Sequence, residues 1–301
     1  MKKLLVIGAS GFVGGYLARE LLAQGYAVRC IARRPEAISA LALAGAEVVK
    51  GDISDPASLT LALDGCAGVY VSIHTLSPQK SGAGGFMDIE KQGIANLVAA
   101  CKAQNVRRLI QITSLGVAHD APSVWTRERW RIEQDLLASG LDVTFIHPGM
   151  IVGIGGRGFG MTVAQAKSRV ALVIGNGRGR MRGIAVSDLV YYLIGVLDEP
   201  RTFGQAYDVG NDEVPSSNEM IDMVAGVLGK TPPPKIHIPR ALLRAAVPLL
   251  ERMLKTPPGA LKDIIGSLGA DGIGDPMPIR SLLPRKLLTF REAVAKALNT
   301  N

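Results

Sequence analysis

The sequence has few cysteines, histidines and aromatic residues, and each shortage argues against a class of function. Its three cysteines, Cys30, Cys66 and Cys101, are far apart and form no CxxC spacing, so neither a disulfide framework nor a zinc site is expected. None of the four histidines pairs with another at i+3 or i+4, so no metal site is predicted. Aromatic residues make up 5% of the chain and do not interleave with clustered basic residues, which argues against nucleic-acid binding.

Long apolar runs are also missing. Charged residues interrupt every apolar run before it reaches the roughly 18 residues that a membrane span needs. The opening segment MKKLLVIGASG has the basic start and apolar run of a signal peptide, but glycines break the run and no small-residue cleavage site follows. The sequence therefore predicts a soluble, cytoplasmic protein that begins with a buried strand and has no transmembrane segment; peripheral membrane contact is not favoured.

Charge is unevenly distributed along the chain. The formal net charge is +8; residues 1–149 carry 15 Lys and Arg against 13 Asp and Glu, and residues 150–301 carry 19 against 13. The basic excess is therefore 2 in the first half and 6 in the second. Such an excess favours anionic ligands or an acidic surface.

Apolar β-type runs alternate with helix-period segments through the first half, which is the rhythm of repeated βαβ units. Continuous apolar strands of this kind are buried on both faces, as in a parallel sheet flanked by helices. Strands are predicted at 4–7, 27–32, 47–50, 69–73, 108–113 and 142–147, and helices at 12–24, 56–64, 87–104 and 123–139.

The pattern changes after Gly149. Residues 153–160 read as a flexible connection, and 161–169 as a short helix. Residues 170–189 have a strand-turn-strand pattern that leads into a helix from Ser187, and 205–210 read as one more strand. The remainder is predicted to be mostly helical, with proline punctuation.

A glycine-rich turn, GASGFVG, directly follows the first predicted strand and precedes an amphipathic helix. Glycines at this spacing make the turn tight, let backbone N–H groups approach a pyrophosphate, and let the helix pack close to the strand. The N-terminus of the helix adds positive potential toward the phosphates. The sequence therefore predicts a dinucleotide site with contacts from Gly8, Ser10, Gly11, Phe12, Val13 and Gly14.

The end of the second predicted strand, CIARRPE, bears on which dinucleotide binds. An acid at this place holds the ribose 2′-hydroxyl of NAD, whereas a 2′-phosphate needs an arginine. Arg33 and Arg34 occupy the place with no acid before them, so NADP(H) is the predicted cofactor, although a solvated pair at a strand end is the alternative. Asp52 and Ile53, after the third strand, are predicted to lie at the adenine, with the carboxylate accepting from its amino group.

These motifs resemble the short-chain dehydrogenase/reductase superfamily in its extended and atypical branches. The resemblance rests on GASGFVG, ARRP, GDISD, TSLG and SGLDVTFIHPGMIVG; a looser one, in GIAVSDLVYYL and YDVGNDEVPSSNEM, points to the subgroup of the NADPH-binding accessory subunit of respiratory complex I. It implies an α/β fold, a Rossmann-type doubly wound parallel sheet with a smaller, mainly helical C-terminal part over the cofactor cleft. The Rossmann domain is predicted to comprise 1–153 and 184–213, and the smaller part 154–183 and 214–301.

The resemblance fails at the residues that usually perform the chemistry. Members that transfer hydride usually carry a Tyr-x-x-x-Lys pair on the helix after strand five and a serine at that strand's end. Ser114 matches the serine, but the tyrosine falls at Trp125 and the lysine at Arg129. An indole N–H does not release its proton near neutral pH, so Trp125 is no general acid, whereas Arg129 could still hold ribose hydroxyls.

Two interpretations of the stretch VWTRERW, residues 124–130, remain open. It could line a cofactor cleft that has lost the usual acid, or its tryptophans could be packing residues on a helix whose arginines are solvated. A shift of the alignment does not restore the motif, because no tyrosine lies between Tyr70 and Tyr191.

Further candidates lie at the ends of the other strands. His74 is the best substitute proton donor, with Ser72 and Ile73 before it on the nicotinamide side, although a structural role is the alternative. His147 is expected to shape the cleft wall. The nicotinamide is expected to lie against Pro148, Gly149 and Met150.

Two further segments of the chain are rich in basic residues. Every second residue of one segment is an arginine: Arg178, Arg180 and Arg182. On a strand this spacing would place all three on one face. They could bind an anionic substrate or partner there, or form a solvated basic edge. Residues 240–255 form an apolar stretch with basic residues; covering of the core is favoured over a membrane-surface role.

Two functions remain possible on these grounds. The first is an NADP(H)-dependent reductase of a small carbonyl or alkene-bearing compound, with protonation from His74, Ser114 or water. The second is a non-catalytic NADPH-binding sensor or assembly subunit. The sequence names neither the substrate nor a protein partner.

Overall fold

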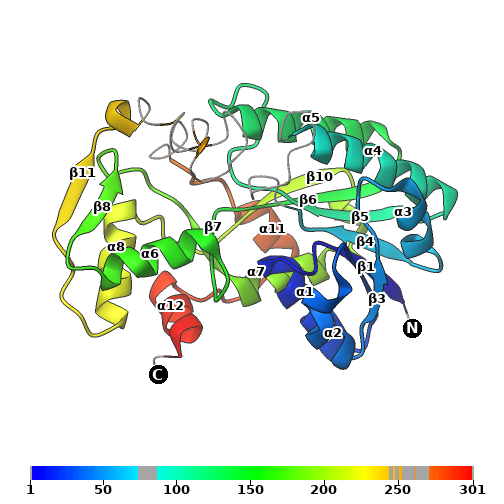
Figure 1. Ribbon diagram of the computed structural model, residues 1–301, viewed down its shortest axis with the longest axis horizontal. Helices are drawn as coiled ribbons and strands as arrows, with labels where there is room; N and C mark the ends of the chain where they lie inside the picture. The colour runs from blue at the N-terminus through cyan, green and yellow to red at the C-terminus, as the bar shows by residue number, and fades with distance from the viewer. Residues whose placement is uncertain are drawn as a thin grey trace.

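A seven-stranded sheet in which every pairing is parallel forms the centre of the larger part of the protein (Figure 1). The computed structural model describes residues 2–73, 87–243, 247, 251–252, 261 and 271–299. In spatial order the strands are β10 (Gln205–Val209), β6 (Asp142–Pro148), β5 (Arg108–Ile112), β4 (Gly68–Val71), β1 (Lys3–Ile7), β2 (Ala27–Ala32) and β3 (Glu47–Lys50). The chain direction across the sheet reverses between β1 and β4, and ligands of open α/β sheets bind at such a reversal. The predicted doubly wound parallel sheet is confirmed.

Helices cover both faces of this sheet because successive side chains of each strand point to opposite sides. Leu4 and Val6 of β1 belong to one apolar core, and Leu5 and Ile7 to the other. The first core includes side chains of α1 (Phe12–Ala23), α2 (Ser39–Leu43), α7 (Val186–Gly195) and α11 (Met277–Leu282). The second includes side chains of α3 (Pro56–Leu63), α4 (Asp88–Ala103) and α5 (Val124–Ala138), the last two in the upper part of Figure 1.

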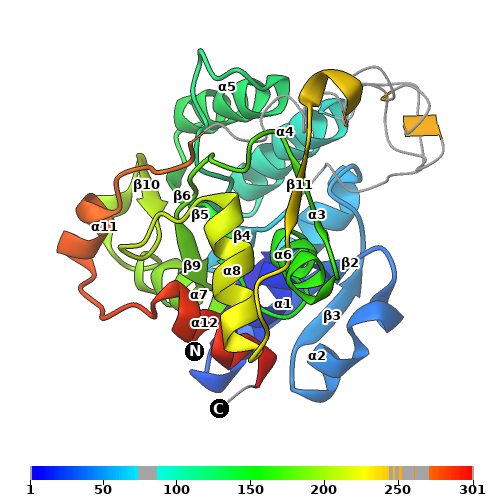
Figure 2. The same cartoon turned by 90° about the vertical axis from the view of Figure 1, so that its left-hand side faces the viewer.

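A smaller body, at the left of Figure 1 and facing the viewer in Figure 2, has a core of its own. Its elements are α6 (Arg157–Lys167), β8 (Ala171–Ile174), α8 (Ser217–Val227), β11 (Lys235–Ile238) and α12 (Phe290–Leu298). Its core joins the larger part through β7 (Met150–Val152) and β9 (Gly183–Ala185), which pair with each other. Two short 3₁₀ turns, η1 (Pro35–Ile38) and η2 (Pro200–Thr202), complete the elements.

The second half differs from the sequence expectation in several places. The helix expected at 161–169 is α6, which begins at Arg157, because Phe159 is buried in the third core and fixes the glycine-containing first turn. The strand-turn-strand segment forms β8 and β9, but these strands are not partners: β8 pairs with β11 and β9 with β7. Gly175 and Gly177, both at positive φ, turn the chain away after β8.

Arg178, Arg180 and Arg182 do not lie on a continuous strand. Arg180 forms a two-pronged ion pair with Asp271, at 3.1 and 2.7 Å, and Arg182 donates to the carbonyl oxygen of Ile273 at 2.6 Å. These two arginines therefore hold the segment that begins at residue 271, while Arg178 is exposed.

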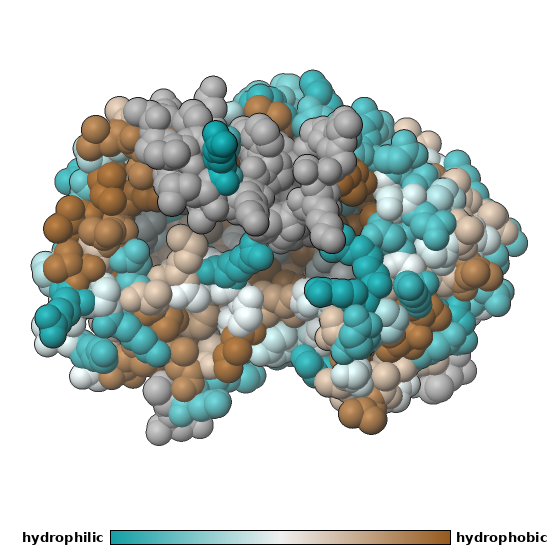
Figure 3. All heavy atoms as spheres, viewed as in Figure 1, coloured by the Kyte–Doolittle hydropathy of each residue, from teal (hydrophilic) through white to brown (hydrophobic). Residues whose placement is uncertain are grey.

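Aliphatic side chains are exposed on the small body. Figure 3 shows apolar side chains gathered over β8 and β11. No helix among the described residues is long and apolar enough to cross a bilayer.

Candidate functional site

The glycine turn brings the ends of β1 and β4 and the start of α1 into close contact. Gly8 has φ +91°, and a Cβ added there would lie 2.1 Å from the carbonyl oxygen of Ser72; one added at Gly14 would lie 2.3 Å from the carbonyl oxygen of Gly8. Gly11, the residue before α1, provides no side-chain cap, so the N–H groups of the first turn from Phe12 onward can face an anion. The turn therefore has the shape that a pyrophosphate site requires.

Phe12 ties this turn to the connection that follows β7. A Cβ added at Gly153 would lie 2.8 Å from the Phe12 ring, and one added at Gly156 would lie 3.0 Å from it. The ring also makes an edge-on contact with Tyr16, with centroids 5.5 Å apart. Glycines in this connection let it pack directly on the N-terminus of α1, so α6 begins beside the glycine turn.

Arg33 and Arg34 lie at the end of β2, exposed to solvent. The Arg33 side chain is 71% exposed, and its Nε lies 3.6 Å from Oδ2 of Asp52. Asp52 is itself held by Ser54, whose backbone N–H and hydroxyl donate to Oδ1 at 2.9 and 2.7 Å. An exposed, loosely paired guanidinium beside a fixed carboxylate is free to turn toward a phosphate.

Ile53 fixes the position of α4 next to the strand ends. A Cβ added at Gly93 of α4 would lie 2.8 Å from the Ile53 side chain. Ser72, after β4, donates its N–H to the carbonyl oxygen of Ile7 at 2.9 Å, and Ile73 packs against the second core. The residues expected near the adenine and nicotinamide therefore lie at the same, carboxyl-terminal edge of the sheet.

Ser114 follows β5 at this edge. Its Oγ is buried and makes no hydrogen bond to the described part of the chain. The next residue, Leu115, donates its N–H to the carbonyl oxygen of Pro148 at 3.0 Å, and a Cβ added at Gly149 would lie 2.2 Å from the carbonyl oxygen of Arg182. Met150 donates to the same Arg182 oxygen at 3.0 Å. The structure thus brings the residue that follows Ser114 into contact with the Pro148–Met150 segment.

Trp125 and Arg129 form a buried pair on α5. The guanidinium carbon of Arg129 lies 4.4 Å from the centre of the Trp125 ring, and Trp125 is 9% exposed. Arg129 faces Glu90 of α4 at 3.2 Å, and both side chains are at most 2% exposed. It also donates to the carbonyl oxygens of Ile73 at 2.9 Å and Ile112 at 3.4 Å. Arg129 is therefore not a solvated surface residue, and Glu90 balances its charge inside the protein.

A second buried cluster joins β5, β6, α5 and β10. Nε2 of His147 lies 2.9 Å from Oε1 of Glu133, and its Nδ1 lies 3.4 Å from Oδ1 of Asp208. Thr113 donates to the same Glu133 oxygen at 2.9 Å, and the N–H of Asp275 donates to Asp208 at 2.9 Å. Burial alone would lower the pKa of His147, but hydrogen bonds to Asp208 and Glu133 outweigh it and raise this pKa to about 9.

This pKa makes stability depend on pH. The pKa of His147 is about 9 in the folded protein and 6.5 as the ordinary value, so the stabilisation by the imidazolium is complete below pH 6.5 and is lost as the pH rises through 9. Between about pH 6 and pH 8 we expect the free energy of unfolding to fall by about 2 kcal/mol more in the wild type than in His147→Asn. Urea denaturation at each pH measures this difference.

An NMR titration of the histidine rings tests the raised pKa of His147 without a variant. A ring that titrates near pH 9 is expected for His147. Titration of all the rings close to the ordinary value would contradict the cluster.

Two features of these buried clusters have little or no signal in the sequence. Glu90 was not singled out, although it shares a face of α4 with Ile94 and Leu97, where an acid among apolar residues indicates a buried partner. The link from His147 to Asp208 joins strands more than 60 residues apart in sequence, and no local pattern gives it. His74 lies outside the described residues.

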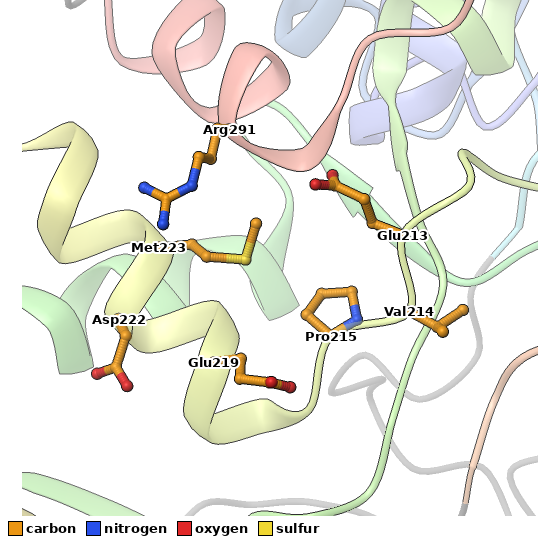
Figure 4. A pocket seen from close by; sticks show the side chains of 7 residues that line it. All are labelled: Glu213, Val214, Pro215, Glu219, Asp222, Met223 and Arg291. Atoms are coloured by element: carbon orange, nitrogen blue, oxygen red, sulfur yellow. The ribbon is translucent and has the colours of Figure 1, made fainter.

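A separate pocket of about 450 Å³ lies in the small body (Figure 4). Its carboxylates already have protein partners: Glu213 accepts from the N–H of Phe290, and Asp222 pairs with Lys235 at 2.5 Å. Glu219 is the capping residue of α8. The pocket is lined by Glu213, Val214, Pro215, Glu219, Asp222, Met223 and Arg291, none of which belongs to the strand-end site.

Comparison with known proteins identifies the family. A profile of the family described as NAD(P)H-binding matches residues 8–171, more than half of the chain. Among solved structures, a nucleoside-diphosphate-sugar epimerase from Staphylococcus aureus superposes with a TM-score of 0.78 at 18% identity, covering 98% of this chain and 99% of that one. MoeE5 in complex with UDP-glucose and NAD gives 0.76 at 20% identity over 99% and 98%. At these identities the similarity concerns the fold.

Curated relatives are similar over shorter stretches. The sterol demethylase protein B of Methylococcus capsulatus is 30% identical over 50% of this chain and 51% of that protein, and the photosystem II assembly factor Ycf39 of Cyanophora paradoxa is 32% identical over 47% and 43%. This chain thus spans about half the length of these relatives. The NAD(P)H azoreductase of Xenophilus azovorans is 24% identical over 75% of this chain and 74% of that protein.

Proposed function

Because this chain belongs to the NAD(P)H-binding family within the Rossmann-type, atypical short-chain dehydrogenase/reductase superfamily, we propose that it is an NADP(H)-dependent reductase of small conjugated carbonyl or alkene compounds, such as quinones and enones. The observation that carries the proposal is Ser114 at the strand-end site, whose buried Oγ has no hydrogen-bond partner among the described residues. Where the superfamily usually has a proton-donating tyrosine and a lysine, Trp125 stacks on Arg129, whose charge is balanced by Glu90.

The residues of the strand-end site fit a nicotinamide dinucleotide. The uncapped first turn of α1 and the glycine turn suit its pyrophosphate, and the exposed arginines after β2 suit a 2′-phosphate. A bound NADPH would supply a hydride at this edge of the sheet. The proposed contacts are Gly8, Ser10, Gly11, Phe12, Val13 and Gly14 for the phosphates, Arg33 and Arg34 for the 2′-phosphate, Asp52 and Ile53 for the adenine, and Ser72, Ile73, Pro148, Gly149 and Met150 for the nicotinamide.

The absence of the usual tyrosine on α5 restricts which compounds can accept the hydride. A simple ketone that accepts a hydride becomes an alkoxide and needs an acid at once, whereas a quinone or an enone becomes a delocalised anion that solvent can protonate. Ser114 can donate one hydrogen bond to the oxygen on which that charge develops, because its buried Oγ has no partner among the described residues. We propose Ser114 as the catalytic residue. Arg129 is a positioning residue, because it donates a hydrogen bond to the carbonyl oxygen of Ile73.

Ser114→Ala tests this assignment. We expect kcat for quinone reduction to fall by about 100-fold, because one donor to a developing anion is lost, while the Kd for NADPH stays the same. The matched control is Ser281→Ala, an exposed serine on α11, which should keep full activity. Unchanged turnover in Ser114→Ala would remove the serine from the reaction.

A second candidate function is binding of NADPH without turnover, as in a sensor or an assembly subunit. The same buried Trp125 and Arg129 pair favours it, because no tyrosine or lysine remains on α5. A bound dinucleotide would then stabilise the fold by mass action. The similarity to the Ycf39 assembly factor adds limited support. The narrower placement with the complex I accessory subunit stays a prediction.

One experiment separates the two functions. NADPH binding is measured by fluorescence titration, and its oxidation is then followed at saturating NADPH with quinones, enones and aldehydes. Oxidation with quinones or enones, but not with simple aldehydes, is expected for the reductase. Tight binding with no oxidation by any acceptor would leave the non-catalytic function.

A further inference from the structure

In the two-stranded sheet of the small body, β8 has one face in the core, and the opposite face of both strands is exposed to solvent. Residues 236 and 172 are directly paired across it, and their side chains are 55% and 51% exposed. Side chains two residues along each strand point to the same side. We call this outward surface the β8–β11 face; it consists of Val170, Leu172, Ile174, Ile236 and Ile238.

The opposite side of β8 packs in the core, so the exposed face belongs to a strand of fixed position. Ala171 and Val173 are 0% and 6% exposed and pack in the third core. The core therefore fixes β8, and β11 is held to it by parallel pairing, so that the aliphatic side chains of the β8–β11 face point toward solvent. Figure 3 shows an apolar area where these two strands lie, at the end of the protein away from the large sheet.

Basic residues flank the β8–β11 face at both ends of the strands. Arg169 directly precedes Val170 and is exposed. At the other end, Arg240 follows β11, and a Cβ added at Gly175, just after β8, would lie 3.2 Å from its Nε. The ion pairs among the described residues include neither arginine.

The strands also come from stretches of sequence without acids. Residues 143–187 contain no Asp or Glu and six Lys or Arg, and residues 223–243 contain no Asp or Glu and three Lys or Arg. These two stretches therefore carry charge of one sign, and among the described residues the acidic partner of β11 is Asp222 of α8, which pairs with Lys235. The exposed arginines beside the face complement a surface of the opposite sign.

We propose that the β8–β11 face docks this protein on an anionic lipid surface. Aliphatic side chains enter the boundary between headgroups and acyl chains, while Arg169 and Arg240 contact lipid phosphates. Each contribution is weak alone, and stable attachment needs both. This proposal is independent of the reductase function.

Two other occupants fit the face less well. A second copy of this chain would bring two sets of arginines together, and their repulsion opposes that contact. A protein partner usually meets a surface with aromatic anchors, and the face has only aliphatic side chains. An anionic bilayer needs no complementary shape, and it attracts both the aliphatic side chains and the flanking arginines.

Sedimentation with vesicles tests the proposal. The full chain is mixed with large vesicles of phosphatidylcholine alone or of phosphatidylcholine with phosphatidylserine. We expect binding only to the vesicles with phosphatidylserine, and a fall of at least about tenfold in the partition coefficient for Leu172→Ser/Ile236→Ser. Arg169→Gln/Arg240→Gln should weaken binding and reduce its dependence on salt.

The control is Leu43→Ser/Leu61→Ser, which removes two leucines that are 91% and 75% exposed on α2 and α3. It should bind vesicles like the wild type. All variants should keep the wild-type circular dichroism and NADPH affinity. The proposal is overturned by absence of binding to anionic vesicles, or by equal binding of Leu172→Ser/Ile236→Ser. It is also overturned if light scattering shows a dimer that this variant converts to a monomer without any vesicle binding.

Discussion

Replacing both Arg33 and Arg34 by serine is expected to weaken NADPH binding by roughly 300-fold and to leave NADH binding almost unchanged. Hydrogen bonds to a charged group contribute about 1.5–3 kcal/mol each, so losing two of them at the 2′-phosphate costs about 3–6 kcal/mol, and roughly 300-fold lies in the lower part of that range. NADH has a hydroxyl at that position and loses little. The variant should therefore change selectivity rather than general affinity.

The geometry around Arg33 explains why the effect should be large. Its side chain is 71% exposed and lies 3.6 Å from Asp52, too far for a strong ion pair, so turning toward a phosphate costs little. Asp52 keeps its two hydrogen bonds from Ser54 whether Arg33 is present or not. The substitutions therefore remove charge at the ribose without disturbing the neighbouring loop.

Fluorescence titration with NADPH and NADH, on the wild type and on the variant, measures this selectivity. Arg107→Ser is the matched control, because that arginine is also exposed and paired with an aspartate, but at the other edge of the sheet. It should leave both affinities unchanged. A wild type that binds NADH as tightly as NADPH would rule out the role proposed for Arg33 and Arg34.

The fold of the first half could be predicted because its signals are local. An uninterrupted apolar run such as Leu4–Ile7 has both faces buried, and only a parallel sheet under two helix layers buries both. The glycines of GASGFVG are likewise read from spacing, since any side chain at Gly8 or Gly14 would meet backbone atoms. The pairing of β8 with β11 could not be predicted, because it joins segments about 60 residues apart that have no distinctive pattern.

The same contrast holds within the candidate site. Ser114 and the Pro148–Met150 segment could be located because each directly follows a predicted strand. Whether Arg129 was solvated or buried could not be decided, because the answer depends on Glu90, a residue on another helix 39 positions away. Helix periodicity gives the face on which a side chain lies, but not the charge that it meets there.

Replacing Arg129 by leucine is expected to destabilise the protein by about 3–5 kcal/mol, the usual cost of removing one partner from a buried ion pair. The change takes away the cation that faces Glu90 in a place where both side chains are at most 2% exposed. It also removes the donors to the carbonyl oxygens of Ile73 and Ile112, and the cation stacked on Trp125. Leucine restores apolar contact but none of these interactions.

Urea denaturation of the wild type and three variants measures the effect. Arg129→Lys keeps the charge but loses the planar stacking and the spread of donors, so about 1–2 kcal/mol is expected. Arg131→Leu, two positions along α5 and exposed, removes an ion pair with Glu128 of the same helix and should cost less than about 0.5 kcal/mol. Glu90→Gln should destabilise as Arg129→Leu does. If Arg129→Leu costs no more than Arg131→Leu, the buried pair does not stabilise α4 against α5, and Arg129 would again be available for the cofactor ribose.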